Sequence, residues 1–115
     1  MNEICDPLGL AVTSTRIWDQ PPVHFDAACV ASVRRAAELS GFSTRDIISG
    51  AGHDAAYVSR VAPTSMIFVP CRGGISHNEA EFTAKEQCAA GAQVLLQAVL
   101  DYDRQLAERH VPART

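Results

Sequence analysis

The chain has 115 residues, of which 47% are apolar and 20% charged, and its net charge is −3 at pH 7. This composition suits one soluble globular unit and argues against a disordered chain. Because Lys and Arg do not cluster, there is no electrostatic basis for binding nucleic acid or an anionic membrane, and we expect neither as a partner. No apolar run nears the roughly 20 residues that span a bilayer. The N-terminus lacks a signal-peptide pattern, so we expect a cytoplasmic protein.

Four cysteines are spread along the chain without a C-x-x-C pair, which argues against a zinc ribbon and a thioredoxin-type motif. We expect free thiols rather than two disulfides, as is usual in the cytoplasm. Cys29 and Cys88 fall on apolar faces of expected helices, where we expect them to act as small core residues.

The first quarter of the chain predicts a strand, a break and a helix. Residues 9–17, GLAVTSTRI, are rich in β-branched residues and predict a strand. The segment at 19–23, DQPPV, contains two prolines that cannot continue a ladder, so we place a boundary there. A helix is predicted over about 27–40, with Asp26 as its N-cap and Gly41 as its C-terminal glycine.

The middle of the chain predicts a short helix followed by a strand. The helix is expected from about Asp54 to Val61 and would stop before Pro63. The run MIFVP at 66–70 is continuously apolar, which is typical of a parallel strand covered on both faces.

The last predicted element is a long amphipathic helix. Thr83 and Glu86 have the spacing of a capping box at its start. Its expected buried stripe recurs at helical spacing over about five turns and consists of Cys88, Ala92, Leu95, Leu96, Val99, Tyr102 and Leu106. The order strand, helix, helix, strand, helix predicts an α/β fold, and so few strands indicate part of a larger domain.

The segment GGISHNEAE at 73–81 is the first candidate for chemistry. It follows the apolar run, and functional loops gather beyond the carboxyl ends of strands in open α/β sheets. Two glycines permit a turn that would present the imidazole of His77. Metal-bound imidazoles are usually held by a carboxylate, for which Glu79 and Glu81 are candidates. The alternative is a surface loop whose histidine has no function.

The segment SGAGHDA at 49–55 is the second candidate. A glycine-rich turn that leads into a helix can hold an anion with its backbone amides. It lacks the Lys-Ser/Thr pair of a phosphate loop and is incomplete as a dinucleotide fingerprint. The alternative is a tight turn with Asp54 as helix cap.

Together, the motifs SGAGHDA, PTSMIFVP and GGISHNEAE, followed by a long helix, resemble the C-terminal part of the hydantoinase/carbamoylase amidases of the M20 metallopeptidase family. That group includes N-carbamoyl-L-amino-acid hydrolases, allantoate amidohydrolases and β-ureidopropionases. The resemblance covers roughly residues 20–105. It implies hydrolysis of a C–N bond in an N-carbamoyl amino acid or related ureido compound, with two divalent metal ions (zinc, or manganese or nickel) and a glutamate base.

The resemblance also implies roles for single residues. His77, in the motif G-I-S-H, matches the C-terminal metal-ligand histidine of the family. The residues expected beside the substrate or behind the metal ligand are Gly50, Gly52, His53, Asp54, Ser76 and Glu81. The family's other ligands and its catalytic base have no counterpart here. We therefore assign no catalytic residue and expect no stable metal binding by this chain alone.

The resemblance implies a mixed-sheet catalytic domain, of which residues 26–110 form a C-terminal fragment. Residues 1–18 then correspond to a remnant strand of the lid or dimerisation domain, 19–25 to the hinge, and 111–115 to a disordered tail. Three hypotheses follow. The chain is the C-terminal part of an amidohydrolase that is inactive by itself, or half of a split enzyme that needs an upstream chain, or a non-catalytic module that self-associates through exposed edges.

Overall fold

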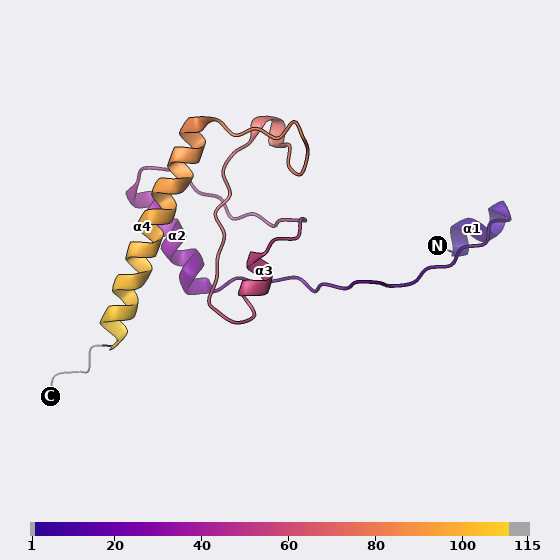
Figure 1. The fold of residues 1–115 in the computed structure, drawn as a ribbon, viewed down its shortest axis with the longest axis horizontal. Coiled ribbons are helices and arrows are strands. Elements are labelled where there is room, and N and C mark those ends of the chain that lie inside the picture. The colour runs from indigo at the N-terminus through magenta and orange to yellow at the C-terminus, as the bar shows by residue number, and fades with distance from the viewer. Residues whose placement is uncertain (1, 111–115) are drawn as a thin grey trace.

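The computed structural model describes residues 2–110, so the expected tail at 111–115 lies outside the described part. The elements, in chain order, are α1 (Asn2–Cys5), η1 (Asp6–Leu8), α2 (Ala27–Leu39), α3 (Ala55–Val58), η2 (Arg72–Gly74) and α4 (Lys85–His110). Figure 1 shows α2 and α4 side by side, with α1 at the far end of an extended arm, residues 9–25. None of the described helices is long and apolar enough to cross a membrane.

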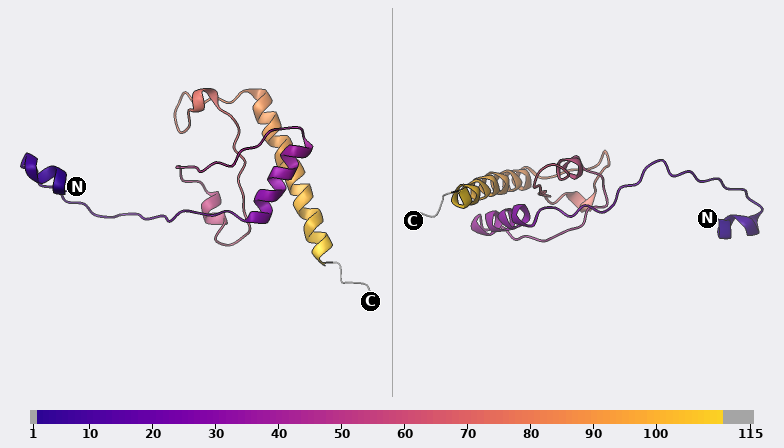
Figure 2. Two further views of the ribbon diagram at one scale, coloured as in Figure 1. Left: turned by 180° about the vertical axis from the view of Figure 1, so that it is seen from behind. Right: turned by 90° about the horizontal axis from the view of Figure 1, so that it is seen from below.

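The molecule is long and thin. Its principal extents are 76 × 41 × 18 Å, and Figure 2 shows the arm leaving the helices in both further views. A compact chain of this length would have a radius of gyration of about 13 Å, whereas this chain has 20.6 Å. Much of the chain therefore has no other part of the chain to pack against.

Residues 2–110 contain no β-strand, so the predicted α/β fold with a mixed sheet is wrong. Both segments predicted as strands, 9–17 and 66–70, lack regular secondary structure. A strand is defined by a ladder to a second backbone about 4.8 Å away. The described residues form no such ladder, so β-branched and apolar composition alone was an insufficient basis for the prediction.

Helix α2 is bounded by the caps that the sequence predicted. The Asp26 carboxylate accepts a hydrogen bond from the N–H of Cys29 at 2.8 Å. Gly41 has a φ of +76°, in the left-handed region that favours glycine. The N–H of Gly41 donates to the Glu38 carbonyl, and the N–H of Phe42 donates to the carbonyl of the residue before Glu38. These two bonds form a Schellman motif, which ends the helix.

The other two predicted helices differ from expectation at their ends. Helix α3 spans only Ala55–Val58 and is shorter than predicted. Helix α4 begins at Lys85, which puts Ala84 at the N-cap position and Thr83 one residue too early for the predicted capping box.

The core is a small cluster between α2 and α4. Its buried apolar residues are Ala36, Ala37, Val94 and Ala98, with Val33 and Ile67 partly buried beside them. The predicted stripe of α4 does not form this core, because Leu95, Leu96 and Val99 are all more than half exposed. Small side chains at the contact let the helices approach closely, so α4 turns its alanine-containing face toward α2.

A polar network fastens the same two helices. Ser32, on α2, is 1% exposed, and its hydroxyl accepts from Arg35 at 3.0 Å and from Gln105 at 3.1 Å. The Asp101 carboxylate accepts from Arg35 and from Gln105, each at 2.7 Å. No buried side-chain nitrogen or oxygen among the described residues lacks a partner. Specific polar contacts therefore supplement the small apolar core between the two helices.

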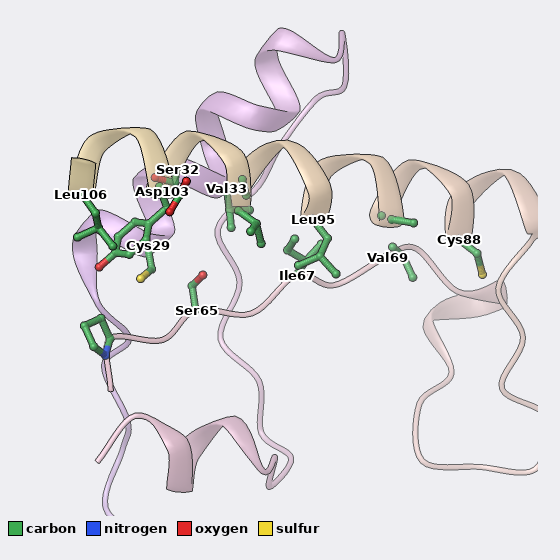
Figure 3. Close-up of a pocket in the computed structure, with 16 residues that line it drawn as sticks. Cys29, Ser32, Val33, Ser65, Ile67, Val69, Cys88, Leu95, Asp103 and Leu106 are labelled. Carbon is green, nitrogen blue, oxygen red and sulfur yellow. The ribbon is translucent and has the colours of Figure 1, made fainter. Parts of the chain in front are cut away.

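Residues 63–70 run along α4 as an extended segment with alternating side chains. Ser65, Ile67 and Val69 lie on the side of α4 (Figure 3). A Cβ added at Gly91 would lie 2.5 Å from Cγ1 of Val69, so a larger residue at position 91 would force the Val69 side chain or the helix to shift. Phe68 instead contacts His53, on the opposite side from α4.

Candidate functional site

Two histidines from separate loops come together, and we call them the imidazole pair. The ring centroids of His53 and His77 are 6.3 Å apart, with the rings inclined at 51°. The Oγ of Ser49 lies 2.8 Å from Nε2 of His53. Phe68 packs against the same ring at 5.4 Å, close to edge-on. The structure thus brings together the two motifs that the sequence singled out.

The loop that carries His53 is a turn fastened by a serine. The Ser49 hydroxyl accepts from the N–H of Ala51 at 3.2 Å, in addition to its contact with His53. Asp54 occupies the N-cap position of α3, as the alternative interpretation expected, but its side chain makes no capping hydrogen bond. Gly50 and Gly52 have ordinary φ angles and no described atom within 4 Å of an added Cβ. The fold itself does not require glycine at those two positions.

The loop that carries His77 is closed at its base. The N–H of Arg72 donates to the Phe82 carbonyl at 2.8 Å, and the Arg72 guanidinium lies 4.1 Å above the Phe82 ring centroid. Gly73 and Gly74 have φ angles of +63° and +68°. The prediction that two glycines form the turn into this loop is therefore confirmed.

Glu81 holds the main chain of this loop rather than the imidazole. Its carboxylate accepts from the backbone N–H of His77 at 3.0 Å. His77 has a φ of +53°, which is uncommon for a residue other than glycine. Glu81 was one of two candidates to hold the second ring nitrogen of His77, and in this structure its carboxylate stabilises the turn through the backbone amide. Ser76 and Glu79 are exposed on the same loop.

The donor set is too small for a complete metal centre. Within residues 2–110 there is no group of three or more His, Cys, Asp or Glu side chains that could hold a metal ion. A catalytic zinc ion takes three protein ligands, and the Glu81 carboxylate is already engaged by a backbone amide. The described residues therefore do not fit the two metal ions that the resemblance implies, and at most contribute to such a site.

Residues 10–101 match the family model described as peptidase family M20/M25/M40. The chain belongs to this family. An N-carbamoyl-L-amino-acid amidohydrolase from Rhizobium meliloti is 50% identical over 99 residues, which cover 86% of this chain and 24% of that protein. An allantoate amidohydrolase from Bacillus subtilis is 37% identical over 95 residues, 83% of this chain and 23% of that protein. The family expected from the sequence motifs is confirmed.

A solved structure of this group has a similar backbone over most of this chain. An amidase of the hydantoinase/carbamoylase family from Burkholderia multivorans aligns with a TM-score of 0.77 and 55% identity, covering 86% of this chain and 24% of that chain. The M20 chain described here therefore spans about a quarter of the length of the relatives it matches.

Two neighbours of the imidazole pair were not predicted. Ser49 lies four residues before His53 across a glycine turn, and only the turn geometry brings its hydroxyl to the ring. Phe68 lies within the apolar run at 66–70, where alternation with Ile67 and Val69 could have indicated that it faces the other side.

Proposed function

We propose that this chain contributes the imidazole pair to the active site of a metal-dependent amidohydrolase that acts on N-carbamoyl-L-amino acids. The observation that carries the proposal is the 50% identity, along 86% of the chain, to the Rhizobium meliloti N-carbamoyl-L-amino-acid amidohydrolase. The allantoate amidohydrolase from Bacillus subtilis is more distant, at 37%. Carbamoyl amino acids are therefore the preferred substrate class, with allantoate-like ureido compounds second.

In this proposal His77 is one metal ligand and His53 faces the substrate. The exposure of His77 supports a role in which its imidazole is accessible to a metal ion. Ser49 and Phe68 fix the ring of His53 on two sides. The remaining residues proposed to border the substrate are Gly50, Gly52, Asp54 and Ser76, while Glu81 shapes the turn. A bound divalent ion would supply Lewis-acid chemistry, with its other ligands coming from outside this chain.

A chimera tests the proposal. The 99 matched residues of the Rhizobium meliloti enzyme are replaced by those of this chain, and release of ammonia from an N-carbamoyl-L-amino acid is measured. We expect activity, and a loss of at least about 100-fold in His77→Ala, since even residues that only support a metal ligand cost about 10–100-fold. His24→Ala is the matched control, because His24 is an exposed histidine outside both loops. A folded but inactive chimera, or equal losses in the two variants, would contradict the proposal.

The 115-residue chain alone is expected to be inactive. Two imidazoles fall short of the three ligands of a catalytic zinc site. Turnover of carbamoyl substrates by this chain with added Zn²⁺ or Mn²⁺ would overturn this part of the proposal.

A further inference from the structure

The turn at 49–54 joins two side chains, Ser49 and His53, just before it leads into α3 (Figure 1). The backbone of His53 is anchored to that helix, because its carbonyl accepts from the N–H of Ala56 at 3.0 Å. The half-buried ring of His53 has the edge-on Phe68 ring as one neighbour and the Ser49 hydroxyl, at Nε2, as the other. The backbone and the ring of His53 are therefore both held in place.

The hydrogen bonds of the Ser49 hydroxyl indicate in which direction its hydrogen points. A serine hydroxyl has one hydrogen and two lone pairs, and one lone pair of Ser49 accepts from the N–H of Ala51 at 3.2 Å. If the oxygen also accepted from Nε2 of His53, the hydroxyl hydrogen would have no acceptor among residues 2–110. Donation to Nε2 uses this hydrogen within the turn. The bond from Ala51 strengthens the donation, because linked hydrogen bonds polarise one another.

The direction of this hydrogen bond fixes the form of the His53 ring. A neutral imidazole carries its proton on one nitrogen, and the hydrogen bond made by the other nitrogen decides which one that is. With Nε2 as the acceptor, the proton lies on Nδ1. The ring forms no other hydrogen bond within the described residues. The Nδ1–H group is therefore the one donor that the ring still has to offer.

Other neighbours of the imidazole pair do not restrict a ring proton in this way. Phe68 packs against His53 through its aromatic ring, so it can orient the imidazole without choosing a tautomer. His77 uses its backbone N–H, which donates to Glu81 at 3.0 Å, and no side chain among residues 2–110 forms a hydrogen bond with its ring. Among the described groups, Ser49 is the one that distinguishes between the two nitrogens of an imidazole in this pair.

We infer that Ser49 is a positioning residue: its hydroxyl donates to Nε2 of His53 and so keeps the ring proton on Nδ1, where it is available to a hydrogen-bond acceptor on the substrate. The inference rests on the proposed function, in which His53 faces the substrate. It adds that the form of His53 depends on a serine four residues earlier in the chain. Ser49 acts through the imidazole and not on the substrate itself.

The ring nitrogens of His53 test where the proton lies. The ¹⁵N-labelled full chain is studied by NMR at about pH 8.5, where histidine is ordinarily neutral. The ¹⁵N chemical shift of each ring nitrogen shows whether it carries a proton, and the signals that vanish in His53→Ala identify this residue. We expect a protonated Nδ1 and an unprotonated Nε2, and a mixture of the two tautomers in Ser49→Ala. A protonated Nε2 in the unmodified chain, or unchanged shifts in Ser49→Ala, would overturn the inference.

Control variants separate the placement of the proton from the general loss of a side chain. The Ser59 hydroxyl, at the end of α3, donates to the Ala56 carbonyl at 2.9 Å, so Ser59→Ala removes a local hydrogen bond that does not involve His53. Phe68→Leu removes the ring that packs against His53 but no hydrogen bond. Both variants should keep the proton on Nδ1, and so should Ser49→Thr, which retains a hydroxyl. A tautomer mixture in all of these variants would overturn the inference.

A cycle of variants in the chimera with the Rhizobium meliloti enzyme tests whether Ser49 acts through His53. Ser49→Ala should lower kcat/KM at least about tenfold, because an imidazole in the wrong tautomer or orientation loses much of its effect. Ser49→Thr should retain most of the activity. In a chimera that already carries His53→Ala, Ser49→Ala should cause no further loss. An equal further loss in that background would show that Ser49 acts independently of His53 and would overturn the inference.

The NMR and kinetic measurements separate this inference from the proposed function. The spectra do not depend on hydrolysis, so an inactive chimera together with the expected shifts would refute the proposed function and leave the placement of the proton unchanged. A chimera that loses activity in His77→Ala and His53→Ala but not in Ser49→Ala would refute the inference and leave the proposed function in place.

Discussion

The helix pair of α2 and α4 and the loop region of residues 42–83 are held together in different ways. The helix pair has its own hydrogen bonds, two caps on α2, a small buried core and a polar network around Ser32. In the loop region residues 42–50 are all exposed, and the base of the His77 loop is closed by a backbone hydrogen bond and a cation–π contact between Arg72 and Phe82. A helix satisfies its backbone locally, whereas extended chain depends on a partner. The candidate site thus lies on the part of the chain that depends most on its surroundings.

The largest effect is expected from a substitution that places a charge between the two helices and so separates the helix pair. Ala36 is 0% exposed between the helices, so Ala36→Asp would bury an unpaired charge and cost about 3 kcal/mol or more. Urea unfolding of the full chain, followed by helical circular dichroism, should show loss of the folded baseline. Ala27→Asp is the control, because Ala27 is exposed in the first turn of α2, where a carboxylate is tolerated. Similar curves for both variants would show that the core does not stabilise the pair.

A smaller effect is expected where the loop region meets the helix pair. Gly91→Ala places a methyl group against Val69, and overpacking of this kind costs about 1–3 kcal/mol. The double variant Gly91→Ala, Val69→Ala removes the clashing methyl groups and should recover part of the loss. Gly50→Ala adds a methyl group in open space and should be close to neutral. No recovery in the double variant would contradict the contact between residue 91 and Val69.

The smallest effect concerns the ion pair between the helices. Arg35 lies 2.7 Å from Asp101 but is partly exposed, so Asp101→Asn should cost only about 0.5–1 kcal/mol. High salt should lower the free energy of unfolding of the unmodified chain more than that of the variant. Equal salt dependence in urea unfolding would indicate that the pair contributes nothing.

The same pair predicts how stability depends on pH. The hydrogen bond from Arg35 lowers the pKa of Asp101, and the hydrogen bonds from Cys29 lower the pKa of Asp26. A carboxyl with a lowered folded pKa stabilises fully above its unfolded value of about 3.9 and loses this contribution as the pH falls through the folded value. Between about pH 5 and 2, the free energy of unfolding should fall less steeply with decreasing pH in Asp101→Asn than in the unmodified chain. The decrease should be less steep still in the double variant that also carries Asp26→Asn.

The predictions from the sequence were correct for local features and wrong for features that depend on distant parts of the chain. The Asp26 cap, the Gly41 end of α2 and the glycine turn at 73–74 were correct, because each depends on neighbours a few residues away. The strands at 9–17 and 66–70 were wrong, because a ladder depends on a distant backbone. At the site, the sequence identified His53 and His77 as candidates but gave neither their distance nor the contact between Glu81 and the backbone of His77.

By itself, the sequence determined where α2 begins and ends, which glycines turn the chain, and which family the chain belongs to. Each of these features depends on residues that are close together in the sequence or on the order of short motifs. Only the tertiary structure decided which face of α4 is buried and which histidines meet. Leu95 and Val99 have the spacing of a core stripe, yet Val94 and Ala98 are buried, because α2 offers small alanine side chains to pack against. Helical periodicity shows that a face is apolar, but the shape of the neighbouring element decides which face is covered.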